Sequence, residues 1–185
     1  DAEAARLCTE RLLRLARAAG KRIHVLHIST ADEFPLLAAN RDIATVEVTP
    51  QHLSFALEDY ARLGTLIQMN PPVREAHHRL AIWKALQSGL VDVIGSDHAP
   101  HTLEEKALPY PKSPSGMPGV QTLLPVMVTL ALQDELLDMP TLVRMTSEMP
   151  AKIYGIQGKG GIQIGNDADF VLTDLYAKKR MERSM

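Results

Sequence analysis

Short apolar runs alternate with amphipathic segments along most of this chain, and that alternation restricts its fold more than any other feature. Three runs rich in branched side chains, at residues 23–28, 43–48 and 91–94, have the length and composition of buried strands. Residues 2–19 and 75–88 repeat apolar side chains at helical spacing. Strands that alternate with helices imply βαβ units, so the sequence predicts an α/β fold with a parallel sheet.

Other segments are marked by their turn residues. Thr30 and Glu33 have the spacing of a capping box, which predicts a helix that reaches about Ala39. Two further helices are expected at about 120–133 and 140–148.

The remaining segments are predicted as extended chain or loop. Residues 66–69 form a short extended piece, and residues 161–174 are typical of a strand, a turn and a second strand. Residues 102–119, rich in Pro, Ser and Gly, are predicted as a loop. Loops of that length in compact domains are usually functional.

Composition excludes several classes of protein. The chain has 185 residues with a formal net charge of −2, and it has no run approaching the roughly 18 apolar residues of a membrane helix. This balance of charge argues against a nucleic-acid binder. The single cysteine, Cys8, excludes a disulfide framework, and the first residues lack the features of a signal peptide, so a cytoplasmic location is expected.

Polar residues gather directly after the three predicted strands. His27 ends the first strand, residues 49–52 follow the second, and residues 97–101 follow the third. The carboxyl ends of parallel strands share one edge of a sheet, where α/β proteins build their sites. We therefore expect the chemistry of this chain at that edge.

Asp97, His98 and His101 form the densest polar group. A carboxylate beside imidazoles can ligate a metal, act as a base or orient a substrate. A capping aspartate with solvent-facing histidines would show the same pattern, and His27 alone would more often be a hydrogen-bonded core residue than a ligand. Convergence of His27 and Asp97 at one edge favours a site, because ligands must meet in space.

The other histidines have simpler interpretations. His24 precedes His27 by three residues and points to the other side of the strand, so it is expected to be structural. His77 and His78 fall at the start of a helix and are expected to be solvated.

Residues 95–106, GSDHAPHTLEEK, resemble the signature at the last barrel strand of dihydroorotases, in the amidohydrolase superfamily. Five further blocks resemble segments of the same family in the same order, and they lie at 24–30, 46–53, 70–74, 114–122 and 161–171. The resemblance therefore covers essentially the whole chain.

This resemblance implies the carboxyl-terminal part of a (β/α)8 TIM-like metal-dependent hydrolase barrel, followed by the start of a small β-domain. Residues 1–158 would supply about strands six to eight with their helices. Residues 159–185 would supply partial return strands of the small β-domain.

The implied activity is zinc-dependent, reversible hydrolysis of the cyclic amide of (S)-dihydroorotate to N-carbamoyl-L-aspartate, in de novo pyrimidine (UMP) biosynthesis. The complete site would hold one or two zinc ions. His27 and Asp97 match metal ligands that serve different ions, and Asp97 also matches the catalytic group that exchanges a proton with the attacking water. Asn70, His101, and the backbone at Ser115 and Gly116 match positions that bind the substrate, whereas His98 matches no ligand role.

Several family features are not found in this sequence. They are the strand-one His-x-His pair, the strand-four carboxylated lysine or aspartate, the strand-five histidine, and the arginine and asparagine that hold the substrate carboxylate. Gln51 stands where some relatives have histidine, which we interpret as tolerable because the metal-binding histidine of this region is His27. We therefore expect this chain to be the carboxyl-terminal portion of a dihydroorotase that alone binds zinc weakly and catalyses little.

Other functions stay open at this point. A hydantoinase or allantoinase would share the barrel, but the second histidine of the His-Ala-Pro-His-Thr block, His101, suits a carboxylated ring. A non-catalytic dihydroorotase-like scaffold would be expected to lose ligands such as His27 and Asp97. An unrelated α/β binding module would need several ordered blocks to match by accident. For partners we expect a small-molecule substrate, no nucleic acid, no membrane and a homo-oligomer, with an association with aspartate carbamoyltransferase left open.

Overall fold

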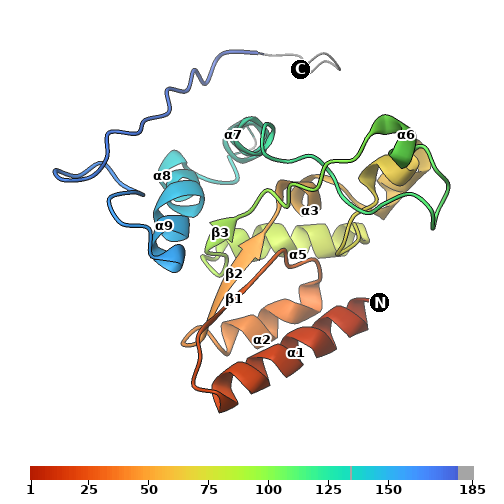
Figure 1. The fold of residues 1–185 in the computed structure, drawn as a ribbon, viewed down its shortest axis with the longest axis horizontal. Helices are drawn as coiled ribbons and strands as arrows, with labels where there is room; N and C mark the ends of the chain where they lie inside the picture. Colours follow the sequence, from red (N-terminus) through yellow and green to blue (C-terminus); the bar gives the residue numbers. More distant parts are fainter. Residues whose placement is uncertain (134, 179–185) are drawn as a thin grey trace.

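The computed structural model describes residues 1–133 and 135–178, and Figure 1 shows the arrangement of their elements. The strands are β1 (Ile23–Val25), β2 (Ala44–Val48) and β3 (Val93–Ile94). The α-helices are α1 (Ala2–Ala18), α2 (Phe34–Ala38), α3 (Pro50–Ser54), α4 (Tyr60–Leu63), α5 (Ala76–Gln87), α6 (Leu103–Lys106), α7 (Leu123–Gln133), α8 (Met139–Val143) and α9 (Met149–Tyr154). Turns of 3₁₀ helix cover Ala31–Glu33, Leu57–Asp59 and Gly64–Ile67, and a π-helical turn, Arg144–Glu148, joins α8 to α9.

The three strands form a parallel sheet in the order β1-β2-β3. Val25 pairs with Val46, and Val48 pairs with Ile94, so the carboxyl ends of all three strands reach the same edge. The predicted parallel sheet and its α/β character are confirmed. Strands β1 and β3 are shorter than the apolar runs that predicted them.

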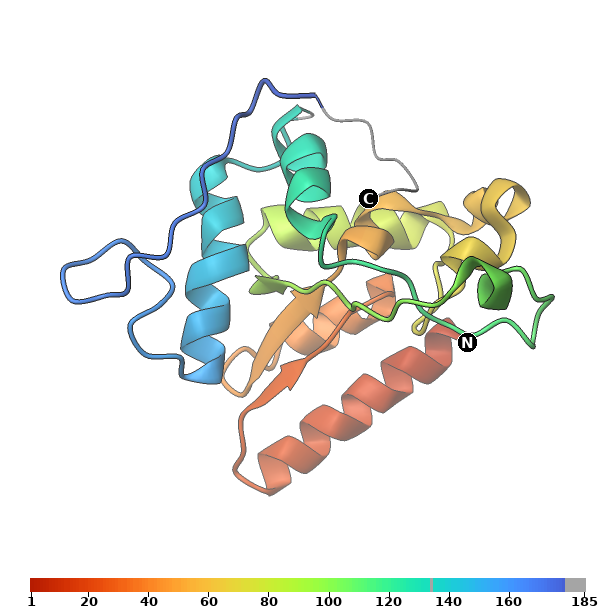
Figure 2. The same cartoon turned by 45° about the horizontal axis from the view of Figure 1, so that its top comes forward.

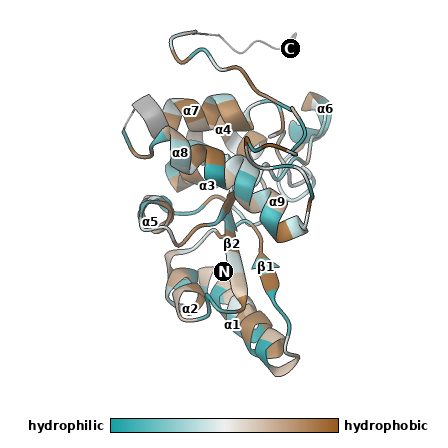
Figure 3. Cartoon of the chain, turned by 90° about the vertical axis from the view of Figure 1, so that its left-hand side faces the viewer, coloured by the Kyte–Doolittle hydropathy of each residue, from teal (hydrophilic) through white to brown (hydrophobic). Residues whose placement is uncertain are grey.

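The core lies on and around β2, whose Ala44, Val46 and Val48 are completely buried. In Figure 3 the strands lie between α1 and α2 below and α7 and α8 above. Each of these helices contributes apolar side chains to the same cluster, among them Leu13, Leu37, Met127 and Leu142. Burial of such side chains stabilises each helix by about 1.5–3 kcal/mol per residue, which short helices need because they are marginal alone.

Asp92 fastens the start of β3 to its neighbours. Its carboxylate is buried and accepts two hydrogen bonds from the Arg41 guanidinium, at 2.6 and 2.7 Å, and one from the Val46 N–H at 2.7 Å. The backbone N–H of Asp92 donates to the Val46 carbonyl at 2.8 Å. One buried carboxylate therefore fixes the register between β2 and β3.

Two local predictions differ from the structure. Residues 66–69 were expected to be extended, but the chain forms the 3₁₀ turn Gly64–Ile67 and straightens only after it. The predicted loop at 102–119 begins with the short helix α6, which a capping box between Thr102 and Glu105 starts. A four-residue helix has too few apolar positions to show a periodic pattern, so only its cap could have indicated it.

The strands expected at 161–174 are absent from the described residues, where no strand follows β3. A strand needs a partner for its backbone groups, and from residue 156 the chain runs outside the helices as an extended trace (Figures 1 and 2). Turns such as Asn166 N–H to the Gln163 carbonyl supply its bonds instead. The division into a barrel part and a small β-domain stays a prediction.

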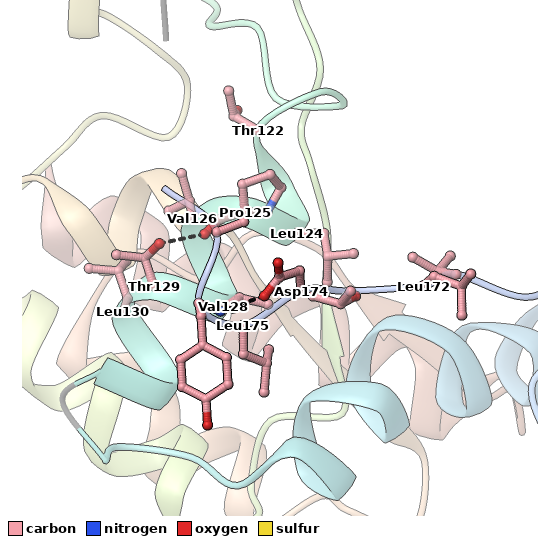
Figure 4. A pocket seen from close by; sticks show the side chains of 14 residues that line it. Thr122, Leu124, Pro125, Val126, Val128, Thr129, Leu130, Leu172, Asp174 and Leu175 are labelled. Atoms are coloured by element: carbon pink, nitrogen blue, oxygen red, sulfur yellow. Dashed lines mark hydrogen bonds between the residues drawn. The ribbon is translucent and has the colours of Figure 1, made fainter. Parts of the chain in front are cut away.

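The end of this segment returns to the body of the protein. Residues 171–177 lie against α7, and the two enclose a largely apolar pocket of about 770 Å³ (Figure 4). Across residues 1–133 and 135–178, no helix has the length and hydropathy needed to cross a membrane.

The Asp92 contacts predict a large effect on stability. Asp92→Ala leaves the Arg41 guanidinium and the buried Val46 N–H without their acceptor, so we expect a loss of about 3 kcal/mol in the free energy of unfolding. Asp42→Ala is the matched control, because Asp42 accepts two bonds of 2.9 Å from Arg17 on the surface. That exposed pair is expected to contribute less than about 1 kcal/mol. Urea unfolding of both variants measures the difference, and equal losses would contradict the role given to Asp92.

Candidate active site

The two predicted metal ligands lie just beyond the carboxyl ends of β1 and β3, and both have a left-handed backbone. The φ angle is 37° at His27 and 42° at Asp97. Among the described residues, Glu135 is the only other non-glycine residue with positive φ. Such conformations cost about 1–3 kcal/mol each and persist at functional sites, where the surrounding structure imposes them. The backbone therefore agrees with the site predicted at these two positions, and their role as ligands stays a prediction.

Glu47, near the end of β2, lies between these two strand ends. Its carboxylate accepts from the His27 backbone N–H at 3.4 Å and lies 3.4 Å from Nε2 of His24. A Cβ on Gly95 would come within 2.4 Å of the same carboxylate, so Gly95 leaves the room that Glu47 occupies. His24 also contacts the Thr45 hydroxyl at 2.8 Å, which agrees with the structural role expected for it.

The separation of the strand ends limits how many metal ligands can meet. Because β2 separates β1 from β3, His27 and Asp97 leave strands that lie roughly 10 Å apart. Within the described part of the chain, no group of three or more His, Cys, Asp or Glu side chains could hold a metal ion. Imidazole and carboxylate are zinc ligands, but zinc takes at least three from the protein. The donor types therefore fit such a metal, and their number here is too small to hold it.

The predicted substrate residues form a second group. Nε2 of His101 lies 3.2 Å from the Ser115 carbonyl oxygen, and a Cβ on Gly116 would come within 3.1 Å of that nitrogen. Gly116 has a φ of 146°, so glycine suits this position because of both its backbone angle and the lack of room for a side chain. Its N–H donates to the Gln68 carbonyl at 2.9 Å, two residues before Asn70. The structure thus brings His101, Ser115 and Gly116 together and bonds them to the segment that carries Asn70. Their contact with a substrate stays a prediction.

His98, the motif histidine without an expected ligand role, fastens a loop. Its Nδ1 accepts from the Gly119 N–H at 3.0 Å, and His98 forms a bridge with Met117. A Cβ on Gly119 would lie 2.2 Å from the Ser96 carbonyl oxygen. This loop is therefore pressed against the strand end that leads into Asp97.

His52 is a buried group that sequence reasoning missed. Nδ1 of His52 lies 2.8 Å from the Thr49 hydroxyl, and Nε2 lies 3.0 Å from the Pro71 carbonyl oxygen. A carbonyl can only accept, so Nε2 carries the proton and Nδ1 accepts from Thr49. Burial lowers the pKa of His52 to about 4, so the ring is neutral near pH 7. The sequence signal that could have indicated this contact was Thr49-Pro50, which is typical of a helix start. The Thr49 hydroxyl is the N-cap of α3 and accepts from the His52 N–H.

Arg74 was also missed as a buried residue. Its Nε donates to the Ser29 hydroxyl at 3.1 Å, and burial lowers the pKa of its guanidinium. Ser29 follows His27 by two residues, so Arg74 connects that loop to the segment after Asn70.

The prediction that His78 is solvated is wrong, whereas His77 is exposed as expected. The side chain of His78 is buried, and its Nδ1 accepts from the Ala31 N–H at 3.0 Å. Burial lowers the pKa of His78. An orphan N–H at the start of the Ala31–Glu33 turn needs an acceptor, and a tertiary contact of this kind leaves no local pattern in the sequence.

Two pockets of the described residues lie away from these side chains. The pocket in Figure 4 is lined by α7 and residues 171–177, and a second one lies near the start of the strands, beside Arg22 and Arg41. None of the six predicted site residues lines either pocket. The candidate site is therefore an edge built from loops.

A parallel sheet with an imidazole, a carboxylate and a glycine-containing loop at its carboxyl edge places this chain in the α/β class, whose enzymes build their sites at the strand ends. The sequence profile of the amidohydrolase family matches residues 7–184. The chain belongs to the amidohydrolase family.

Curated relatives carry two kinds of name. A dihydroorotase of Halobacterium salinarum is 41% identical over 174 residues, which are 94% of this chain and 40% of that protein. A dihydroorotase of Archaeoglobus fulgidus gives the same identity and coverage. An L-hydantoinase of Paenarthrobacter aurescens is 35% identical over 183 residues, covering 95% of this chain and 40% of that protein. The chain thus spans about two fifths of the length of these relatives.

Solved structures share the fold. An L-hydantoinase (dihydropyrimidinase) from Arthrobacter aurescens superposes with a TM-score of 0.83 at 35% identity, covering 87% of this chain and 37% of that one. A dihydropyrimidinase from Brevibacillus agri gives a TM-score of 0.85 at 27% identity, with 91% and 39% coverage. The three-stranded sheet and its helices therefore have the arrangement of the corresponding part of these proteins.

The left-handed backbone at Asp97 predicts an unusual response to glycine. Asp97→Gly removes the steric cost of positive φ, so the unfolding free energy in metal-free buffer should rise by about 1 kcal/mol. Asp32→Gly is the matched control in the regular turn Ala31–Glu33, where glycine should lower stability by up to about 1 kcal/mol. Thermal and urea unfolding measure both changes. A loss at position 97 as large as that at position 32 would contradict the strain.

The lowered pKa of His52 predicts a stability change with pH. Since the pKa is about 4 in the folded protein and near 6.5 in the unfolded chain, the unfolded chain binds the proton first as pH falls. Stability is therefore complete above pH 6.5 and decreases down to pH 4, by about 3 kcal/mol in total. His52→Gln should flatten this part of the profile, whereas His77→Gln at the exposed neighbour of His78 should not. Urea unfolding at a series of pH values checks this, and parallel profiles for wild type and His52→Gln would contradict it.

Proposed function

We propose that the complete protein is a dihydroorotase, a hydrolase that reversibly opens the cyclic amide of (S)-dihydroorotate to N-carbamoyl-L-aspartate in de novo pyrimidine biosynthesis. The observation that carries this proposal is the left-handed backbone at His27 and Asp97, both at one edge of the sheet. A non-catalytic scaffold would gain nothing from strain at these two positions. The relatives named dihydroorotase, at 41% identity, support the choice of substrate.

Asp97 is the group that moves the proton in this proposal. Its carboxylate takes a proton from the water that attacks the ring carbonyl and delivers it to the ring nitrogen as the C–N bond breaks. The reverse reaction uses the same group in the opposite order. A carboxylate suits both steps because it can accept and then donate.

His101 is the proposed contact for the substrate carboxylate. The Ser115 carbonyl lies 3.2 Å from Nε2 and fixes the orientation of the ring. An imidazolium donates from both nitrogens, so the ring can hold Ser115 with Nε2 and offer Nδ1 to a carboxylate. In the present structure Nδ1 lies 3.6 Å from the exposed carboxylate of Glu105, which marks this side as accessible to an anionic group.

We further propose that one or two zinc ions bind at this edge, with His27 and Asp97 among their ligands and the others supplied by another part of the protein. A zinc ion there would polarise the carbonyl and activate water near neutral pH. With two ligands, the isolated chain is expected to hold zinc weakly and to turn over little substrate. A homo-oligomer and an association with aspartate carbamoyltransferase belong to the same proposal.

The second candidate is a hydantoinase. It is favoured by the L-hydantoinase relative at 35% identity and by the matching solved structure with a TM-score of 0.83. The two functions differ in the substrate ring, because dihydroorotate carries a carboxylate and hydantoin does not. His101 beside Ser115 is the feature that favours the carboxylated ring.

The proposal predicts a substrate order for the complete protein. Dihydroorotate should be hydrolysed in preference to dihydrouracil, hydantoin and allantoin, and Asp97→Asn should lower kcat by about 10³-fold through loss of the proton carrier. Asp42→Asn, on the surface, is the control and should keep full activity. Absorbance assays with measured zinc content decide between the candidates. Turnover of hydantoin without dihydroorotate would establish the second candidate, and no turnover of any ring would favour a scaffold.

A further inference from the structure

Lys106 is a buried cation that the proposed chemistry does not use. Its side chain lies in α6, and the residue is only 5% exposed. The ammonium donates to three backbone carbonyl oxygens: Gln68 at 2.9 Å, Pro114 at 2.9 Å and Gly116 at 3.0 Å. An ammonium has three protons, so these bonds use its full donor capacity.

Backbone carbonyls, rather than a carboxylate, surround the ammonium of Lys106. Across residues 1–133 and 135–178, no carboxylate forms an ion pair with it, and burial lowers its pKa. Burying an ammonium without a carboxylate is costly, so three well-placed carbonyl dipoles must offset its desolvation. A methionine or leucine would fill the same space at lower cost. The geometry therefore indicates that this lysine serves to connect the backbone segments whose carbonyls it binds.

The three carbonyls belong to the two sides of the candidate substrate site. Gln68 lies two residues before Asn70, on the segment that follows the Gly64–Ile67 turn. Pro114 and Gly116 flank Ser115, whose carbonyl orients His101. Lys106 thus bonds to both sides at once, and its position decides the distance between them.

Neighbouring bonds make this junction rigid. The Gly116 N–H donates to the same Gln68 carbonyl that Lys106 holds, and the Gln68 side chain donates to the Ser113 carbonyl at 2.7 Å and the Ser115 hydroxyl at 3.2 Å. The Thr65 hydroxyl donates to the backbone carbonyl of Lys106 itself. Figures 1 and 2 show α6 beside the short helical segment that contains α4, as these bonds require.

We propose that Lys106 is a positioning residue for the substrate side of this site. Its ammonium fixes the Asn70 segment and the Ser115–Gly116 turn at the separation that a small cyclic amide needs. Lys106 touches neither substrate nor metal, and it acts through the backbone of the residues that do. This inference rests on the proposed function for its kinetic consequence, but its structural consequence can be measured without any activity.

The first test uses hydrogen exchange in the complete protein. Lys106→Met keeps most of the length of the side chain and removes the three donors, so the amides of residues 113–119 and 65–72 should exchange at least about 10-fold faster, because bonds to charged groups are lost. Amides of β1 and β2 should exchange as in the wild type. Lys112→Met, at an exposed lysine of the same loop, is the control and should change nothing. Unchanged exchange in both segments of Lys106→Met would overturn the proposal.

The second test uses steady-state kinetics with the best cyclic amide. Lys106→Met should raise KM by about 10-fold or more while kcat stays within about threefold and bound metal is unchanged, since the loss acts on substrate binding. A fall in kcat with KM unchanged, or a loss of metal, would contradict a role confined to the substrate side. If the wild type hydrolyses none of the rings, the proposed function fails, and the exchange experiment still decides the role of Lys106.

A milder variant covers the case in which Lys106→Met does not fold. Gln68→Met removes the amide bonds to Ser113 and Ser115 but leaves the lysine in place. Its buried Oε1 has no partner in the described residues, so removing that oxygen leaves no donor without an acceptor. We expect a smaller rise in KM, about threefold, and faster exchange at 113–119 alone. Wild-type KM and exchange in this variant would contradict the contribution of the Gln68 side chain to the rigidity of this junction.

Discussion

The parallel pairing of β1, β2 and β3 is the constraint on which the rest of the structure depends. It brings His27, Glu47 and Asp97, from three separate parts of the chain, to one edge. The pairing is secured at the other end of the sheet, where the buried carboxylate of Asp92 binds both Arg41 and the Val46 N–H. Because register decides which side chains reach the edge, this contact at the start of β3 also affects the position of the residues that follow the strand.

The two halves of the candidate site are held by different means. On the side of the expected metal ligands, His27 and Asp97 are fixed by the backbone itself, through left-handed residues just past the ends of β1 and β3. On the substrate side, buried side chains donate hydrogen bonds to backbone carbonyls. His52 donates to Pro71, and Lys106 donates to Gln68, Pro114 and Gly116. Loops need such donors because they lack the ladder of hydrogen bonds that fixes a strand.

Prediction from sequence succeeded where a pattern is local and failed where a contact is tertiary. The parallel sheet, α1, α5 and the capping box at Thr30 follow from apolar periodicity and turn chemistry within a few residues. The burial of His78 could not be predicted, because it follows from the Ala31 N–H, 47 residues away in sequence. The strands expected at 161–174 failed for a related reason, since a strand forms only where a partner accepts its backbone bonds. For the candidate site, the position of His27 and Asp97 at one edge of the sheet was predictable, but their left-handed backbone was not.

Gln51 and Asp97 differ in what the structure requires of their side chains. Gln51, where some relatives have histidine, is buried and donates from Nε2 to the Ser96 carbonyl at 2.9 Å, while its Oε1 finds no partner in the described residues. The position therefore needs one N–H aimed at the residue before Asp97, and an imidazole can provide that N–H as well as an amide. Asp97 has less freedom under the proposed function, which needs a carboxylate at a position where the backbone is also left-handed. Backbone angles and buried donors thus separate the residues proposed to carry the chemistry from those that hold the surrounding chain in place.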